Sequence, residues 1–229
     1  MSVPLVLFDI DGTLVRRSGP AHREALVTAV RAVTGLETTT DGIPVHGMLD
    51  PDILTHMMRR AGAPARLARE SMPEMVRRAE RAYLRTCPDL TRKTCPGARA
   101  LLERLERRGV VLGLVTGNLT RIGWKKLACA GLRGYFRFGA FGEMARDRAG
   151  LARLAIRRAR AEGWIERASP IALVGDAPSD ILAAKANRIR SIAVYTGIST
   201  ADELRAYQPD ALLADLRALR LSLITGAAG

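Results

Sequence analysis

The chain has 229 residues, of which 48% are hydrophobic, which is enough to bury one large domain or a core with a small insert. It contains no run of eighteen or more apolar residues, so we expect no membrane-spanning segment. The formal net charge of +13 raises the question of nucleic-acid binding. However, aromatic residues make up only 4% and the arginines are spread over many predicted helices, so we expect no nucleic-acid partner but a basic surface around a site for an anionic small molecule.

The N-terminus and the cysteines indicate the compartment. The N-terminus runs straight into a strand and lacks the basic and apolar regions of a secretory signal. Its three cysteines, Cys87, Cys95 and Cys129, lack metal-ligand spacing, and their odd number argues against a disulfide framework. We therefore expect a cytoplasmic protein, as a monomer or a homodimer.

The first predicted element is a buried parallel strand that begins at Leu5 and ends in two carboxylates, Asp9 and Asp11. A strand interior cannot hold two charges without a compensating cation, so both are expected just past the strand's C-terminal end, where open α/β sheets bind ligands. Gly12 allows the backbone to turn sharply there. Because two like charges held this close repel each other, the pair indicates a bound cation, and carboxylate oxygens suit Mg²⁺.

Residues 16–92 show helical patterns and no clear strand. Apolar residues at three- and four-residue spacing predict a helix that Pro20 begins and Gly35 ends. Pro51, with Asp50 as its N-cap, begins a second helix, and a longer helical run spans about 64–85. We expect these helices to form an insert over the C-terminal edge of the sheet.

From residue 96 onward, helices and apolar strands alternate, which predicts a parallel sheet with right-handed crossovers that the first strand joins. The expected strands are 110–115, 135–141, 171–174, 191–195 and 211–213. The expected helices are 98–108, 119–130, 148–162, 178–187, one near residue 204, and 215–224. The polar residues that stand out in the sequence each directly follow a predicted strand: Asp9 and Asp11, Thr116, and Asp176. One site formed by all of them is therefore a better interpretation than separate solvated loops.

The segment Phe8–Leu14 resembles motif I, DxDGT, of the haloacid dehalogenase-like (HAD) phosphatases. The resemblance implies that Asp9 is the nucleophile, which forms an aspartyl-phosphate. It also implies that Asp11 protonates the leaving alkoxide and later deprotonates the attacking water. Family members that cleave carbon–halogen bonds usually lack the second acid, so Asp11 disfavours dehalogenation. The family plan is a Rossmann-like core with an inserted helical cap; here the core is 1–15 and 93–229, and the cap is 16–92.

The segment Leu114–Asn118 resembles motif II of the family. The Thr116 hydroxyl and nearby backbone amides are then expected to hold the phosphate, with Gly12, Gly117 and Asn118 as binding residues. The alternative is that Thr116 merely caps the helix that follows.

The segment Leu173–Asp180 resembles motif IV, GDxxxD. Asp176 ends a strand and Asp180 lies one helical turn later, so both can face the same ion. We expect Asp9, Asp11, Asp176 and Asp180 to be the Mg²⁺ ligands, the ion neutralising the repulsion between phosphate and Asp9. A simpler explanation for Asp180 is that a carboxylate is favourable near a helix N-terminus. Asp180 can serve the helix and bind the ion at once.

Motif III departs from the family pattern, because no lysine lies between Lys126 and Lys185. Our first candidate for the missing cation is Arg148, at the start of the helix that precedes motif IV, although Arg and Lys are not interchangeable. Lys125 and Lys126 are the second candidates; for them a solvated helix face is the simpler interpretation. Impaired activity is the third possibility.

The resemblance covers nearly the whole chain and implies hydrolysis of a small phosphate monoester, with phosphoglycolate phosphatases closest in layout. One alternative is a phosphosugar mutase of the β-phosphoglucomutase type, which would need a bisphosphate activator and release little phosphate. Another is a non-catalytic HAD-fold binding protein, which the four aspartates argue against. Residues of the insert should set specificity, and candidate substrate contacts there are the following: Arg16, Arg17, His46, Gly47 and Asp50.

Overall fold

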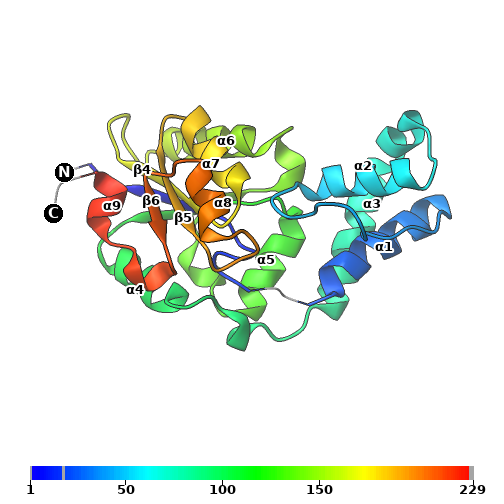
Figure 1. Ribbon diagram of the computed structural model, residues 1–229, viewed down its shortest axis with the longest axis horizontal. Coiled ribbons are helices and arrows are strands. Elements are labelled where there is room, and N and C mark those ends of the chain that lie inside the picture. Colours follow the sequence, from blue (N-terminus) through cyan, green and yellow to red (C-terminus); the bar gives the residue numbers. More distant parts are fainter. Residues whose placement is uncertain (1, 17–18, 227–229) are drawn as a thin grey trace.

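The computed structural model describes residues 2–16 and 19–226, and its centre is a six-stranded parallel sheet (Figure 1). The strand order is β3-β2-β1-β4-β5-β6. The strands are β1 Leu5–Phe8, β2 Val111–Val115, β3 Phe138–Ala140, β4 Ile171–Gly175, β5 Arg190–Val194 and β6 Ala211–Leu213. The order reverses at β1, which lies between β2 and β4, so the C-terminal end of β1 is the switch point where such sheets bind ligands. The predicted α/β class is confirmed.

Helices cover both faces of the sheet, which explains why its central strands are continuous apolar runs. Val6 and Phe8 point to the face covered by α4 (Ala98–Arg107), α5 (Thr120–Cys129) and α9 (Leu221–Thr225). Leu5 and Leu7 point to the other face, where α6 (Arg148–Ala161) and α7 (Pro178–Ala186) pack. The short α8 (Ala201–Ala206) packs Leu204 against the edge of the sheet.

The inserted helices are α1 (Ala21–Thr34), α2 (Asp50–Arg60) and α3 (Ala65–Thr86), and they lie together at one end of the molecule (Figure 1). They share an apolar cluster of their own, which Leu119, the N-cap of α5, and Ile122 of α5 complete. The insert therefore rests on α5. The division into a core and a cap at residues 16 and 92 stays a prediction. No helix in the described part of the chain is both long enough and apolar enough to span a membrane.

Two predicted elements are shorter in the structure. The strand predicted at 135–141 is reduced to β3, because a 3₁₀ turn occupies Arg133–Tyr135. The closing helix predicted at 215–224 is divided into a 3₁₀ turn, Leu216–Ala218, and α9. The break has a local cause: the Asp215 carboxylate accepts the Arg217 amide at 2.8 Å, and Leu219 then becomes extended (φ −69°, ψ 122°).

Candidate active site

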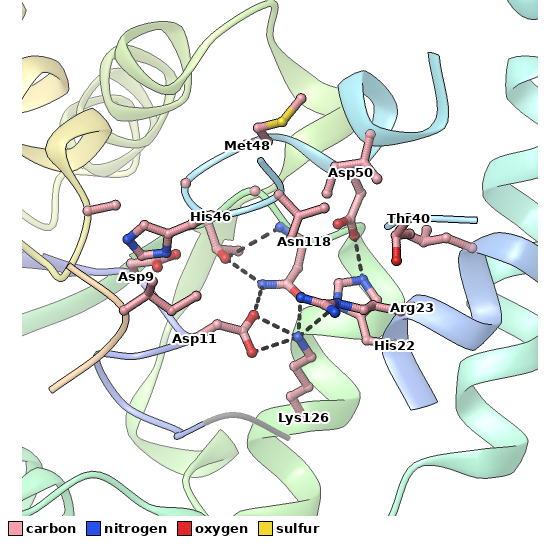
Figure 2. Close-up of a pocket in the computed structure, with 18 of the residues that line it drawn as sticks. Asp9, Asp11, His22, Arg23, Thr40, His46, Met48, Asp50, Asn118 and Lys126 are labelled. Carbon is pink, nitrogen blue, oxygen red and sulfur yellow. Dashed lines mark hydrogen bonds and ion pairs between the residues drawn. The ribbon is translucent and has the colours of Figure 1, made fainter. Parts of the chain in front are cut away.

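Most of the predicted site residues line one cavity at the C-terminal edge of the sheet (Figure 2), whereas Gly12 and Asp180 lie behind its lining. Asp9 follows β1, Thr116 follows β2 and Asp176 follows β4. Since the carboxyl ends of adjacent parallel strands share one edge, these side chains meet although they are far apart in sequence. The cavity has a volume of about 460 Å³, and residues of α1, α2 and the loop between them form its opposite wall.

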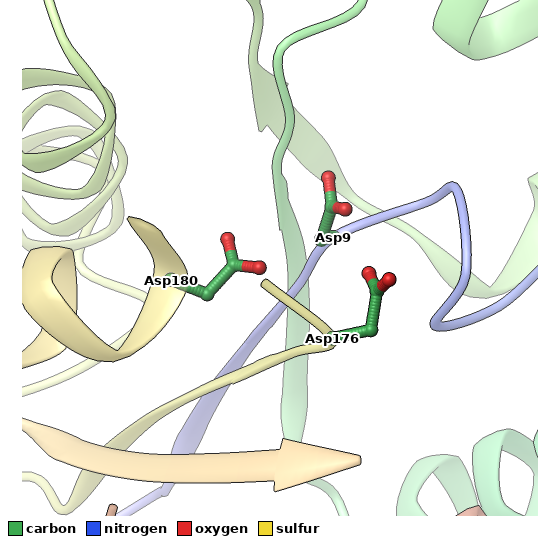
Figure 3. A group of neighbouring side chains, drawn as sticks. All are labelled: Asp9, Asp176 and Asp180. Carbon is green, nitrogen blue, oxygen red and sulfur yellow. The ribbon is translucent and has the colours of Figure 1, made fainter. Parts of the chain in front are cut away.

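Three buried carboxylates form a cluster, two of which, Asp9 and Asp176, line this cavity (Figure 3). Asp9, Asp176 and Asp180 each present one oxygen, and these oxygens lie within 4.8 Å of one another. Burial, together with the neighbouring negative charges, raises the pKa of Asp176 well above its usual range and that of Asp180 to about 7. The buried Oδ1 of Asp180 accepts no hydrogen bond from the described residues. Three hard oxygen donors, one of them unsatisfied, fit a divalent cation such as Mg²⁺.

Gly12 lies against this cluster, with φ of +82°. A Cβ atom at position 12 would lie 2.2 Å from the Asp176 Oδ2 atom, so both the left-handed backbone and the close approach require glycine. We expected Gly12 to help bind phosphate. The observed geometry shows that it makes room for Asp176, and its part in phosphate binding stays a prediction.

Arg148 supplies a buried cation directly beside the candidate nucleophile. Its Nη1 atom lies 2.9 Å from Asp9 Oδ1 and 3.4 Å from Asp180 Oδ1, and it also donates to the Val115 carbonyl at 3.3 Å. Burial acts against the charged form of Arg148, but the carboxylates outweigh it and raise its pKa. Arg148 is positioned by the start of α6, where Asp147 accepts the Gly150 amide at 2.6 Å.

Asp11 and Lys126 form a second ion pair, on the side of the cavity nearer the insert (Figure 2). We expected Asp11 at the metal and Lys126 on a solvated face. The burial of Lys126 shows that the second expectation is wrong, whereas the Asp11 side chain faces Lys126 and its part in metal binding stays a prediction. Lys126 is only 1% exposed, and its Nζ atom donates to the two Asp11 oxygens at 2.8 and 2.6 Å. Although burial opposes ionisation of Asp11, the Lys126 ammonium lowers its pKa overall. Lys126 is buried because the insert covers this face of α5, whereas Lys125 beside it is half-buried.

The Lys126 ion pair continues into the inserted helices through His22 and Asp50 (Figure 2). Lys126 Nζ lies 3.1 Å from His22 Nδ1, and His22 Nε2 lies 2.9 Å from Asp50 Oδ2. An ammonium group only donates, so Nδ1 accepts and the Nε2–H donates to Asp50. Sequence reasoning missed His22; its place two residues after the helix-opening Pro20 was the available signal.

The predicted N-cap role of Asp50 is also wrong. Leu49 is the N-cap of α2, and the Asp50 carboxylate instead accepts the Leu119 amide at the start of α5, at 2.8 Å. The next amides of α5 are occupied in the same way: those of Thr120 and Arg121 donate to Glu143 and Glu80. Three carboxylates therefore accept hydrogen bonds at the N-terminal end of α5, where the helix dipole is positive.

The remaining candidate phosphate donors lie just before α5. The Thr116 hydroxyl does not cap α5; it accepts from the Asn118 amide group at 2.8 Å. Asn118 also donates to Asp11 at 2.8 Å and accepts from Lys126 at 2.7 Å. Gly117 is confined by the insert, since a Cβ there would lie 2.1 Å from the Met48 carbonyl oxygen. The Asn118 side chain is therefore engaged by Asp11, Thr116 and Lys126, and phosphate binding at this loop stays a prediction.

The insert loop around His46 lies directly over the acidic cluster. His46 Nε2 is 3.1 Å from Ser199 Oγ and 3.8 Å from Asp176 Oδ2, and burial lowers the pKa of His46. The Gly47 carbonyl accepts from Arg148 at 3.4 Å. Arg16, at the boundary of the insert, pairs its amide with the Lys93 carbonyl at 2.7 Å, whereas Arg17 lies outside the described residues.

Comparisons with known proteins agree with this geometry. Residues 3–187 match the family model for haloacid dehalogenase-like hydrolases. A protein of Dickeya dadantii (strain 3937) named "Probable phosphatase IndB" is 28% identical over 221 residues, which cover 92% of this chain and 89% of that protein.

Two solved structures show the same fold. β-Phosphoglucomutase from Clostridium difficile superposes with a TM-score of 0.73 and 16% identity over 99% of this chain and 96% of that one. A predicted phosphoglycolate phosphatase from Haemophilus somnus 129pt gives a TM-score of 0.66 and 21% identity, over 93% and 95% of the two chains. With the family model covering most of its length and the strand-end carboxylates in place, the chain belongs to the haloacid dehalogenase-like hydrolases.

Proposed function

We propose that this protein is a Mg²⁺-dependent phosphatase that hydrolyses a small phosphate monoester through an aspartyl-phosphate on Asp9. The observation that carries the proposal is the buried Asp9 carboxylate at the sheet's switch point, between the Arg148 guanidinium at 2.9 Å and the Asp176–Asp180 pair. The relative named as a phosphatase, 28% identical over nearly the whole chain, supports the same reaction class.

In the first step, an Asp9 oxygen attacks phosphorus and the bond to the leaving oxygen breaks, while Asp11 gives that oxygen a proton. In the second step, water attacks the aspartyl-phosphate and gives a proton to Asp11, which releases phosphate and restores Asp9. The ion pair with Lys126 favours the ionised Asp11 that the second step requires. The first step therefore requires Asp11 to leave Lys126 and carry a proton.

The side chains around Asp9 and a divalent ion would both interact favourably with the negative charge of the phosphate. Arg148 is always charged and can pair with phosphate oxygens as well as with Asp9, while Thr116 offers a hydroxyl donor. A divalent ion would be held by Asp9, Asp176 and Asp180, and it would neutralise the repulsion between the incoming phosphate and Asp9.

The opposite wall of the cavity favours a small acidic leaving group, as in phosphoglycolate. His22, Arg23 and Lys126 line it, next to apolar side chains such as Leu26 and Ile53. In this proposal residues 16–92 act as the cap that closes the site and selects the substrate.

The test is phosphate release from a panel of small monoesters, phosphoglycolate and glucose phosphates included, with Mg²⁺ and then with excess EDTA. We expect turnover with Mg²⁺, none with EDTA, and the highest kcat/KM for a substrate whose leaving group carries a carboxylate. Asp9→Asn is the matched control, because it removes the nucleophile and little volume. Isomerisation of a sugar phosphate that requires a bisphosphate activator, with little phosphate release, would replace this proposal with the mutase reaction.

A further inference from the structure

A second cavity, also of about 460 Å³, lies at the opposite edge of the sheet from the active site. The strands β4 and β5 begin beside it, at Ile171 and Arg190, whereas the catalytic edge is where they end. The arginines that line it come from α6, from the loop after α6, from the turn after α7 and from the first residue of β5. They are Arg153, Arg157, Arg160, Arg167, Arg188 and Arg190. We expected the arginines to be dispersed, and here the fold brings six of them together.

No carboxylate in the described part of the chain lies within ion-pair distance of these six arginines, although the charge of Arg190 helps to lower the pKa of nearby Asp210. None belongs to the described lining of the cavity either. Exposed arginines elsewhere do find partners: Arg31 pairs with Glu37 at 2.9 Å, and Arg66 with Glu70 at 2.7 Å. The buried Nε of Arg190 has no hydrogen-bond partner in the part of the chain that the structure describes. Six like charges around one hollow repel one another unless an anion bridges them.

The ends of two helices account for some of this arrangement, though not for all of it. Arginines near the C-terminal ends of α6 and α7 are favourable for the helix dipoles. Arg167 and Arg190, however, lie outside these helices. Arg188 has φ of +54°, a left-handed conformation at a helix end, which glycine normally occupies. The dipole alone does not explain an arginine in that position.

We propose that this cavity binds a small anion with two or more phosphate groups. The guanidinium forks give several bidentate contacts to phosphate oxygens, and a volume of this size suits a small ligand. Side chains such as Ile156 and Ile189 add an apolar floor, while the described lining has no aromatic ring on which a base could stack. The site is independent of the proposed catalytic function, because it shares no residue with the active-site cavity.

The test is calorimetric titration of the full chain with inorganic tripolyphosphate at moderate salt, with EDTA present. We expect binding to weaken about tenfold in Arg157→Gln/Arg160→Gln. It should change less than about twofold in Arg107→Gln/Arg108→Gln, which removes two exposed arginines from the end of α4. Hydrolysis of the best monoester should stay the same in both variants.

Arg188→Gly guards against a folding artefact, because glycine relieves the left-handed strain. We expect this variant to have a Tm raised by about 2 °C and a weaker affinity for tripolyphosphate. Weakened binding in a more stable protein cannot be ascribed to unfolding.

Two further comparisons show which cavity binds tripolyphosphate and which part of the ligand is recognised. Binding that persists in Arg148→Met but weakens in Arg157→Gln/Arg160→Gln supports the second cavity, and the reverse result overturns it. ATP bound as tightly as tripolyphosphate, or more tightly, supports recognition of the phosphate chain, with or without a contribution from the nucleoside. The proposal is overturned by no binding, by an equal loss in the α4 control, or by tighter binding of a DNA duplex that depends on the same arginines.

Discussion

The active-site cavity has two sides, each built around a carboxylate and a buried cation. On the metal side, Asp9 pairs with Arg148, next to Asp176 and Asp180. On the insert side, Asp11 pairs with Lys126, which continues to His22 and Asp50 (Figure 2). The metal-side residues all come from the sheet edge and from α6 and α7. On the insert side, the series of side-chain contacts runs from α5 to α1 and α2.

This difference teaches which part of the site is fixed and which depends on the insert. The Asp9 and Arg148 side chains are each 7% exposed and held by neighbours of the core. The Asp11 side chain is 39% exposed, and its partner Lys126 also contacts a helix of the insert. Movement of the inserted helices away from α5 would separate His22 from Lys126, whereas the Asp9–Arg148 pair would lose only the long contact between Arg148 and the Gly47 carbonyl, at 3.4 Å.

The largest effect is expected from Asp9→Asn, which removes the nucleophile on the metal side. Turnover should fall by about 10⁴-fold or more, because no other described carboxylate is placed to form the covalent intermediate. Phosphate release measures the loss, and circular dichroism should show an unchanged fold. Full activity in this variant would rule out a covalent step on Asp9.

A smaller but still large loss is expected from Arg148→Ala. The guanidinium neutralises charge beside the reacting phosphate, so kcat should fall about 10²- to 10³-fold, and Arg148→Lys should recover part of it. Lys125→Ala is the matched control and should change kcat less than about twofold. An equal loss in the control would assign the motif III role elsewhere.

On the insert side, Lys126→Met should have a moderate effect on both rate and stability. It leaves Asp11 without its cation, so we expect kcat to fall about tenfold. The free energy of unfolding should fall by about 1–2 kcal/mol, less than for a fully buried ion pair, because the Asp11 side chain is partly exposed to solvent. Urea unfolding measures the stability. The double variant Asp11→Asn/Lys126→Met should regain most of that stability, since the unpaired charge is gone. Additive losses would mean that the pair contributes little.

The smallest expected effect is the stabilisation of the protein by Mg²⁺, which distinguishes the metal side of the cavity from the insert side without an activity assay. At a Mg²⁺ concentration about ten times Kd, binding should contribute about 1.4 kcal/mol and raise Tm by about 3–5 °C. Asp180→Asn should reduce this rise, because it removes a ligand from the metal cluster. Lys126→Met should retain it. A rise that is unchanged in Asp180→Asn would place the ion away from this cluster.

Much of the metal side follows from local sequence. Asp9 and Asp176 each end an apolar run, and parallel strands place such ends at one edge, so their meeting was predictable without a structure. Arg148 was predictable as the first basic residue of the helix before motif IV. The breaks at Tyr135 and Asp215 were not, because a short turn changes the backbone without altering the apolar pattern.

The insert side could not be predicted in the same way. Lys126 looks like a solvated residue of an amphipathic helix, and only the packing of α1–α3 on α5 buries it. Asp50 has the sequence signature of an N-cap, yet its carboxylate serves a helix that starts about seventy residues later in the chain. Which helix a carboxylate caps depends on what is adjacent in space.

The sequence by itself determined the parallel sheet, the order of its elements and the carboxylates at its switch point, because strand period, turn residues and charge are local properties. The tertiary structure alone decided that Asp11 faces Lys126 rather than the acidic cluster, that His22 joins them, and that six arginines surround a second cavity. Those outcomes depend on contacts between residues far apart in the chain. The physical reason is that burial and electrostatic pairing are set by distance in space, which no local pattern encodes.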